Sequence, residues 1–155
     1  MTEETTTIGL GFYWDDLDVG FKFRTLGRTI TETDLVNFVN MSWLTEELFT
    51  NAQSRKDVAI KGRPVPAALV YCFAEGLLTP SMQDTGLAFF NAEIDVKHPT
   101  LVNDTIHVEC EVIELRAASK GDRGHVRTLN QVVNHNGEVV IQYNPLRMMK
   151  RRRGL

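Results

Sequence analysis

Apolar residues occupy nearly every position of the segment Gly62–Pro80, which contains three prolines. Glu75 is the one charged residue of the run that follows Pro66, and the apolar positions fall on every side of a helical wheel. Proline suits the first turn of a helix and ends a helix that it follows, so Pro64 and Pro80 indicate where this helix begins and ends. A helix that is apolar on all sides is stable only when other elements surround it. The segment is too short to span a bilayer, which needs roughly 20 residues, so we predict a buried central helix.

Apolar and polar residues alternate along much of the remaining chain, which is the pattern of strands with one buried face. The alternating segments are 21–30, with a bend near Gly27, and then 88–96, 106–112, 126–133 and 138–143. Asn136 and Gly137 lie between the last two segments, and this dipeptide is the strongest short signal of a β-hairpin. Several antiparallel strands and one apolar helix predict an α+β fold in which a curved sheet wraps around the helix.

Two segments before the central helix have other patterns. Thr31 is an N-cap residue type, Asp34 is an acid three positions later, and apolar residues follow at helical spacing, which predicts a short helix over 32–41. Residues 41–60 have no strand pattern, and we predict a loop with one or two short helical turns. A loop of this length in a compact domain is usually functional.

The composition fits a single domain, because 155 residues are enough for one hydrophobic core. We expect this domain to cover 1–155, with a loose N-terminus at 1–11 and a basic tail at 150–155. The formal net charge of −3 favours neither a nucleic-acid nor a membrane partner. Cys72 and Cys110 lie in apolar segments and indicate reduced core residues of a cytoplasmic protein. The acidic N-terminus lacks the basic and apolar parts of a signal peptide.

The residues offer few candidates for catalytic or binding chemistry. The four histidines are scattered without ligand spacing, and the sequence has neither a phosphate-binding glycine loop nor a serine nucleophile elbow. Glu75 is either a paired core acid or a catalytic carboxylate. Glu46 and Glu47 suit the first turn of a helix, and their place in the loop leaves a catalytic role open. The basic run 150–153 is either a solvated tail or a clamp for phosphate.

Three segments resemble a known family. Residues 62–70, with the sequence Gly-Arg-Pro-Val-Pro-Ala-Ala-Leu-Val, are similar to the start of the central helix in MaoC-like hot-dog proteins. Residues 86–89 and 104–108 resemble the same family in their own places, and the resemblance spans about 12–149. It implies a hot-dog fold, a dimer, and the hydration or dehydration of enoyl-CoA thioesters, as in (R)-specific enoyl-CoA hydratases. Coenzyme A is then part of the substrate, and no separate cofactor and no metal is implied.

The family's acid–base pair is an Asp followed five positions later by a His, shortly before Thr-Asp or Thr-Asn. In this register Thr50 and Asn51 match, whereas Leu44 stands at the Asp position and Phe49 at the His position. Phe49 lies 14 positions before Arg63 (63 − 49), as the family's His does, so the register needs no gap. Neither Leu nor Phe can transfer a proton, and the loss of general acid–base catalysis costs typically ~10²–10⁴ in rate.

The resemblance also implies which residues bind the thioester. Ala67 stands where the family has a Gly whose N–H polarises the thioester carbonyl, and a helix N-terminal N–H can do the same from Ala. The loop from Trp43 to Asn51 would line the acyl pocket. Basic side chains would meet the phosphates of coenzyme A, and the candidates are Arg116, Lys120, Arg123, Lys150, Arg151 and Arg152.

We therefore expect an acyl-CoA thioester-binding protein in which ordinary hydratase activity is slow or absent. One alternative is an active hydratase or thioesterase that uses a relocated carboxylate, Glu46 or Glu47. The other is a non-catalytic subunit that pairs with an intact homologue. Phe89 and Phe90 place an aromatic side chain on each face of one strand, and only one face can cover the helix. A second surface should cover the other face, so we predict a homodimer or a larger assembly.

Overall fold

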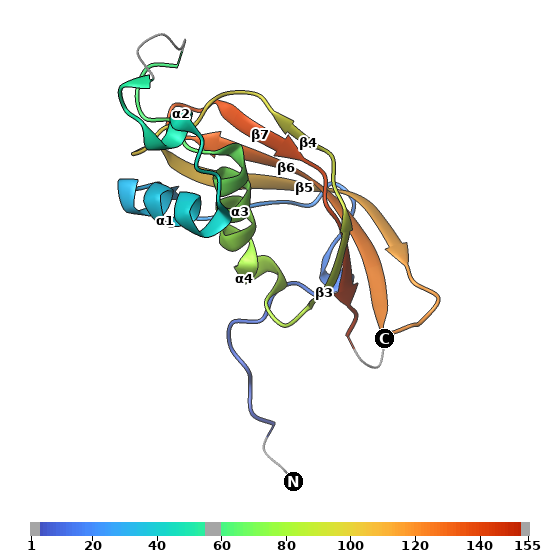
Figure 1. The fold of residues 1–155 in the computed structure, drawn as a ribbon. Helices are drawn as coiled ribbons and strands as arrows, with labels where there is room; N and C mark the ends of the chain where they lie inside the picture. The colour runs from blue at the N-terminus through green and yellow to red at the C-terminus, as the bar shows by residue number, and fades with distance from the viewer. Residues whose placement is uncertain (1–3, 55–59, 153–155) are drawn as a thin grey trace.

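An eight-stranded antiparallel sheet curves around one central helix, α3 (Ala67–Leu77), in the computed structural model, which describes residues 4–54 and 60–152 (Figure 1). The strands are β1 (Lys22–Arg24), β2 (Arg28–Thr29), β3 (Gly86–Asn91), β4 (Ile94–Val96), β5 (Thr105–Ala117), β6 (Arg123–Asn134), β7 (Val139–Tyr143) and β8 (Leu146–Lys150). The remaining helical elements are the 3-10 turn η1 (Trp14–Asp16), α1 (Glu32–Ser42), α2 (Glu47–Thr50) and α4 (Thr79–Met82). The predicted α+β class and the curved sheet around one helix are confirmed.

The long strands β5 and β6 form the centre of the sheet, whose main path runs β1-β5-β6-β7-β4. The strand β2 also pairs with β5, and β8 lies between β6 and β3. Within the described residues, β3 pairs with β8 alone and β4 with β7 alone, so both have one open edge. The sheet can therefore extend beyond β3 and β4 only through another chain or segment.

The main core lies between α3 and the concave face of the sheet. Leu69, Val70 and Ala74 of α3 are buried there, against residues of the central strands such as Val108 and Val132. Burial of each large side chain of this kind contributes about 1.5–3 kcal/mol to folding before entropy is subtracted. A second, smaller cluster lies under the far end of β5 and β6, and it consists of Leu17, Val112, Val126 and Met149.

The short helix α1 and the last hairpin follow the predicted local signals. The Asp34 N–H donates to Thr31 Oγ1 at 3.2 Å, and the Thr31 N–H donates to Asp34 Oδ2 at 2.8 Å. This reciprocal pair satisfies two N–H groups at the start of α1. Gly137 has a φ of 81° in the turn between β6 and β7, a conformation that glycine adopts without strain.

The central helix is not buried on all sides, so that part of the prediction is wrong. Ala67, Ala68, Cys72 and Gly76 are exposed, because the sheet covers only one side of α3 in the single chain. Cys72 is therefore not a core residue, whereas Cys110 is buried as predicted. These exposed residues are small and leave an open strip along the helix.

The helix end and the strand divisions also differ from the prediction. The helix α3 ends at Leu77, and Pro80 lies in the first turn of α4 rather than closing α3. Segment 21–30 forms the two short strands β1 and β2, and segment 88–96 is divided into β3 and β4, which pair with different strands. No strand was predicted for residues 146–149, but they form most of β8, which also includes Lys150 of the expected tail. The strand β8 is held by pairing with β3 and β6, and such non-local pairing cannot be seen in the local sequence pattern.

Candidate functional site

The N-terminus of α3 presents two free N–H groups to solvent. The N–H groups of Leu69 and Val70 donate to the Pro66 carbonyl at 3.0 and 3.3 Å, and this closes the first turn. The N–H groups of Ala67 and Ala68 have no partner among the described residues, and both alanines are exposed. Unsatisfied N–H groups and the helix dipole give this end of α3 a partial positive charge. It can therefore hold the oxygen of a carbonyl or an oxyanion.

The segment that enters α3 is fixed to its neighbours. The Val65 N–H donates to the Thr100 carbonyl at 3.0 Å, and the Val102 N–H donates to the Arg63 carbonyl at 2.9 Å. The Arg63 guanidinium forms an ion pair with Glu32 of α1, with 2.7 Å between Nε and Oε2. These contacts connect the start of α3 to α1 and to the segment before β5, so the two free N–H groups have a defined position.

The loop from Trp43 to Asn51 contains Leu44 and Phe49, the two positions that the sequence resemblance assigns to the family's acid–base pair. Helix α1 ends at Trp43, which has a φ of 63° and is 86% exposed. Leu44 is half-buried, and Phe49 of α2 packs against the main core cluster, which includes Val65 and Leu69 near the start of α3. Both positions thus carry apolar side chains, and neither side chain exchanges a proton.

The two carboxylates of this loop are exposed, and one of them, that of Glu47, is engaged within the loop. Glu46 is the N-cap residue of α2, and Glu47 Oε2 accepts a hydrogen bond from Asn51 Nδ2 at 2.7 Å. Asn51 Oδ1 in turn accepts from the Gln53 N–H at 3.0 Å. The Asn51 amide is therefore engaged within the loop, and Glu46 is the carboxylate of this pair that lacks a side-chain partner among the described residues.

Three of the basic residues that the sequence predicts as coenzyme A contacts come together at the connection between β5 and β6. Arg116, Lys120 and Arg123 line one hollow of about 440 Å³ with Ser119 and His125. Arg123 pairs with Asp122 at 2.8 Å, whereas Arg116 and Lys120 have no ion-pair partner in the part of the chain that the structure describes. The β5–β6 connection, which carries these residues, lies well apart from α3 (Figure 1).

The other basic candidates are held by carboxylates near the chain's beginning and after α4. Lys150 pairs with Asp84 at 3.3 Å, Arg151 with Asp15 at 3.0 Å and Arg152 with Asp16 at 2.9 Å. The guanidinium groups also lie over rings, that of Arg151 4.7 Å from the Trp14 centroid and that of Arg152 4.5 Å from the Tyr13 centroid. Residues 150–152 are thus engaged rather than free: Arg151 and Arg152 are held by η1, and Lys150 is held by Asp84. Residues 153–155 of the predicted tail lie outside the described residues.

The charged side chain of α3, Glu75, is paired rather than isolated. Its Oε1 accepts hydrogen bonds from Arg147 Nη2 at 2.6 Å and from the Tyr143 hydroxyl at 2.9 Å. Burial and the nearby Glu75 charge both raise the pKa of Tyr143, so the phenol stays protonated and donates. The structure therefore supports the paired-acid interpretation of Glu75. Its partner Arg147 was not identified from the sequence, because strand β8 was not predicted there.

Two adjacent spaces lie at the C-terminal end of α3. An open groove of about 480 Å³ is mostly apolar, and its lining includes Phe12, Phe23, Leu26, Gly76 and Leu78. A smaller cavity of about 30 Å³ shares Phe12, Phe23, Leu78 and Ser81 with the groove. The cavity is also lined by Cys110, Thr128, Asn130 and Arg147. Neither space was predicted from the sequence, because their walls come from six separate segments of the chain.

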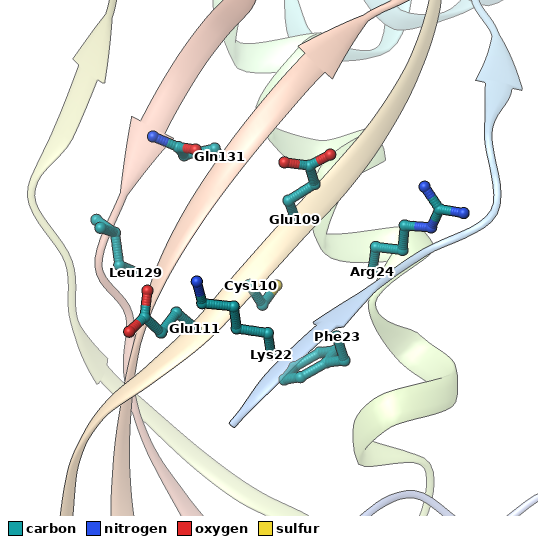
Figure 2. Close-up of a pocket in the computed structure, with 8 residues that line it drawn as sticks. All are labelled: Lys22, Phe23, Arg24, Glu109, Cys110, Glu111, Leu129 and Gln131. Carbon is teal, nitrogen blue, oxygen red and sulfur yellow. The ribbon is translucent and has the colours of Figure 1, made fainter. Parts of the chain in front are cut away.

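A further hollow of about 430 Å³ lies on the strands β1, β5 and β6 (Figure 2). Register brings Lys22 opposite Glu111 and Arg24 opposite Glu109 across β1 and β5. Strand alternation places these four charged side chains on the face opposite the core residue Cys110. Opposite charges on a solvated face explain this hollow without a ligand.

The described residues lack two kinds of feature. No group of three or more His, Cys, Asp or Glu side chains is placed to hold a metal ion. No described helix is both long and apolar enough to cross a membrane.

Solved structures with the same fold come from several bacteria. The chain matches a putative MaoC domain protein dehydratase from Chloroflexus aurantiacus with a TM-score of 0.89 and 22% identity, over 96% of this chain and 43% of that one. It matches a Mycobacterium tuberculosis protein described as having a double hotdog fold, with a TM-score of 0.86 and 20% identity, over 97% of this chain and 47% of that one. An (R)-hydratase from Pseudomonas aeruginosa matches with a TM-score of 0.76 and 22% identity, over 92% of this chain and 88% of that one.

These similarities show the hot-dog fold, as predicted. The chain spans less than half the length of the first two proteins and most of the third. No protein-family model matches the sequence, and no curated protein is similar to it.

Proposed function

We propose that this chain binds acyl-CoA thioesters at the N-terminus of α3 and lacks the acid–base pair that hydrates them. The observation that carries the proposal is the pair of free, exposed N–H groups at Ala67 and Ala68, beside a loop with Leu44 and Phe49 at the dyad positions. The (R)-hydratase and the dehydratase that share the fold support the substrate class. In this proposal the thioester carbonyl oxygen accepts hydrogen bonds from the two alanine N–H groups.

In such a site, the N–H donors that bind the carbonyl oxygen and the acid–base pair that transfers protons make separate contributions to the rate of hydration. Donors fixed at a carbonyl oxygen stabilise the charge that develops there, and they act whatever the neighbouring side chains are. General acid–base catalysis adds typically ~10²–10⁴ in rate and needs a group that titrates. Leu44 and Phe49 provide none, so we expect thioester binding with little or no hydration of crotonyl-CoA.

The basic hollow between β5 and β6 is our candidate for the phosphates of coenzyme A. Arg116 and Lys120 have no ion-pair partner among the described residues, so phosphate would not have to displace a carboxylate from them. Lys150, Arg151 and Arg152 are weaker candidates because each already pairs with an aspartate. Since the hollow lies far from the α3 N-terminus of the same chain, we propose that it serves a thioester bound to a second copy (Figure 1).

A second copy is also our proposal for the open edge of the sheet. The strands β3 and β4 pair on one side only, and their exposed apolar side chains are Leu87, Phe89, Phe90, Ile94 and Val96. An open edge with apolar side chains on it favours pairing with another strand. Light scattering should therefore report at least a dimer at micromolar concentration. Phe89→Glu should shift it toward monomer, whereas Val19→Glu, at an exposed position outside β3 and β4, should not; a wild-type monomer contradicts the proposal.

The exposed carboxylates of the loop support one alternative function, in which Glu46 or Glu47 acts as a relocated acid–base group of a hydratase or thioesterase. Glu46 is the better candidate because Glu47 is engaged by Asn51. Glu46→Gln would then abolish turnover and leave binding intact. In the other alternative, a non-catalytic subunit, the purified chain would bind thioester fully only with a homologue that has the intact pair.

Calorimetric titration of the purified chain tests the proposed function. We expect crotonyl-CoA to bind more tightly than free coenzyme A, because only the thioester has a carbonyl for the two N–H groups. Equal affinities would show that the α3 N-terminus is not the thioester site, and the absence of binding by either ligand would contradict the proposal as a whole.

A further inference from the structure

The groove at the C-terminal end of α3 includes Gly76, which lies on the same exposed side of the helix as Ala68 at the candidate thioester site. Ala68, Cys72 and Gly76 are exposed at four-residue intervals, so they lie on the same side of α3, from its N-terminus to the groove. Eight residues separate Ala68 from Gly76, which is a rise of about 12 Å at 1.5 Å per residue. A medium to long acyl chain can cover that distance.

The groove suits the carbon chain, and the cavity suits one small polar group. The groove has a volume of about 480 Å³ and aromatic and aliphatic walls. The cavity has only about 30 Å³, while one water molecule needs about 10–15 Å³ of such volume. Four of its lining residues, Ser81, Thr128, Asn130 and Arg147, have polar side chains. A purely hydrocarbon chain would leave these groups without a new partner.

Hydrogen bonds already engage several polar groups around the cavity. The Thr128 hydroxyl donates to Asn130 Oδ1 at 2.6 Å, and the Ser81 hydroxyl donates to the Leu78 carbonyl at 2.6 Å. Arg147 and Tyr143 form a network with Glu75, to which both donate. Arg147 donates to Glu75 through Nη2 alone, so its remaining N–H groups have no side-chain or carbonyl partner among the described residues. Arg147 is therefore able to donate to an oxygen that enters the cavity.

The charge balance of the network selects a neutral oxygen. Glu75 lies 2.6 Å from the Arg147 guanidinium and neutralises it. A carboxylate that entered beside Arg147 would also meet the Glu75 charge, which disfavours it. A hydroxyl or keto oxygen has no such penalty and gains a hydrogen bond from a charged donor, which is stronger than one between neutral groups.

We propose that the acyl group bound by this protein is a medium to long chain with a neutral hydroxyl or keto group at its far end. The chain lies in the groove beside Gly76 and Leu78, and its terminal oxygen accepts a hydrogen bond from Arg147 in the cavity. This inference rests on the proposed thioester-binding function and names the substrate class of that site.

Gly76 offers a test that preserves the fold. A Cβ at Gly76 would meet nothing within 4 Å, and the residue is helical, so a larger side chain there enters the groove without strain. Leucine also favours a helix more than glycine does. We expect Gly76→Leu to block the groove, while the matched control Gly76→Ala leaves it open.

The experiment measures the affinities of crotonyl-CoA, lauroyl-CoA and ω-hydroxylauroyl-CoA by calorimetry for the full chain and both variants. We expect wild type to bind ω-hydroxylauroyl-CoA about tenfold more tightly than lauroyl-CoA, because one hydrogen bond from a charged donor contributes about that gain in affinity. Gly76→Leu should lose this tight binding at least about tenfold and keep that of crotonyl-CoA, while Gly76→Ala should keep both.

Three results would overturn the inference, and they are distinguishable. Equal affinities for the two long thioesters would show that the cavity does not recognise a polar end. Tight binding of the hydroxylated chain by Gly76→Leu would show that the groove is not the chain's path. No binding of any thioester, crotonyl-CoA included, would instead remove the proposed function on which the inference rests.

Discussion

The Arg147 guanidinium donates a hydrogen bond to Glu75 Oε1 at 2.6 Å, and this contact joins the central helix to the strand β8. The Tyr143 hydroxyl donates to the same oxygen at 2.9 Å. A charged pair at the boundary of an apolar core is costly to break on one side only, because the remaining charge loses its partner but not its burial. The pair therefore explains how one acid is tolerated in an otherwise apolar helix.

We predict that Glu75→Leu lowers the free energy of unfolding by about 3 kcal/mol, as expected for an uncompensated charge in a largely buried place. The double variant Glu75→Leu with Arg147→Met should be more stable than the single variant, because it removes the orphaned cation as well. Urea unfolding monitored by circular dichroism measures both. A double variant less stable than Glu75→Leu would show that the pair is not energetically coupled.

The contact between Asp15 and the end of the chain predicts a pH dependence. Burial acts to raise the pKa of Asp15, but hydrogen bonds from the Arg152 N–H and the Arg151 side chain, and the Arg151 charge, outweigh it and hold this pKa below its ordinary value of 3.8. A carboxyl with a lowered pKa stabilises the fold fully above its ordinary pKa, and this stabilisation is lost as the pH falls through the lowered value.

We therefore expect Asp15→Asn to lower the melting temperature at neutral pH, and this effect to be lost as the pH falls below 3.8 and through the lowered pKa of Asp15. Thermal unfolding over a series of pH values measures the difference between the two proteins. Asp18→Asn is the matched control, because Asp18 is exposed and has no ion pair among the described residues; it should follow wild type. A difference for Asp15→Asn that stays constant down to the lowest pH would contradict the ion-pair account.

Ala67→Pro tests the thioester contact directly. Proline has no N–H and fits the first position of a helix, and Pro66 already has the extended conformation that a following proline requires. We expect the affinity for crotonyl-CoA to fall about tenfold, the value of one hydrogen bond.

The matched ligand is butyl-CoA, a thioether without a carbonyl oxygen, whose affinity should stay unchanged in Ala67→Pro. Circular dichroism confirms that the helix is retained. Equal losses for the thioester and the thioether would mean that the substitution disturbs the site as a whole, and the carbonyl contact would then have no support.

The sequence predicted the architecture better than the details of its surface. The helical cap at Thr31, the hairpin at Gly137 and the alternation in segments 106–112 and 126–133 are local signals, and each of these is confirmed. Segment 88–96 differs, because it is divided into β3 and β4, whose residues are all exposed. The exposed face of α3 was not foreseen, because an apolar sequence does not tell whether a covering surface belongs to the same chain or to another. The partners of Glu75 were not foreseen either, because Arg147 is 72 positions away in the chain (147 − 75).

The structure brings only some of the predicted site residues close to one another. In a single chain, the hollow with Arg116 and Lys120 is separate from the start of α3 and from the loop 43–51. Arg151 and Arg152 were expected near phosphate, and long-range pairing with Asp15 and Asp16 engages them instead. Spacing along a sequence identifies residue types, whereas such pairings depend on the tertiary fold.

Restoring the acid–base pair tests the interpretation of Leu44 and Phe49. We expect Leu44→Asp with Phe49→His to raise crotonyl-CoA hydration well above that of wild type, and each single change to have little effect, because acid and base act as a unit. Loss of the crotonyl-CoA absorbance measures the rate. Phe49 packs against the core, so urea unfolding must first show that the double variant is folded; a folded double variant that binds crotonyl-CoA and remains inactive contradicts the interpretation.

The most direct test of the account is native mass spectrometry of the purified wild-type chain after incubation with crotonyl-CoA. This measurement reports in one spectrum whether thioester is bound and whether it has gained the mass of one water. The account predicts a complex that contains intact crotonyl-CoA, because the α3 N–H groups bind the carbonyl and Leu44 and Phe49 transfer no proton. Rapid and complete conversion of the thioester to its hydrated form, at a typical enzymatic rate on the order of 10 s⁻¹, or the absence of any complex, would contradict it.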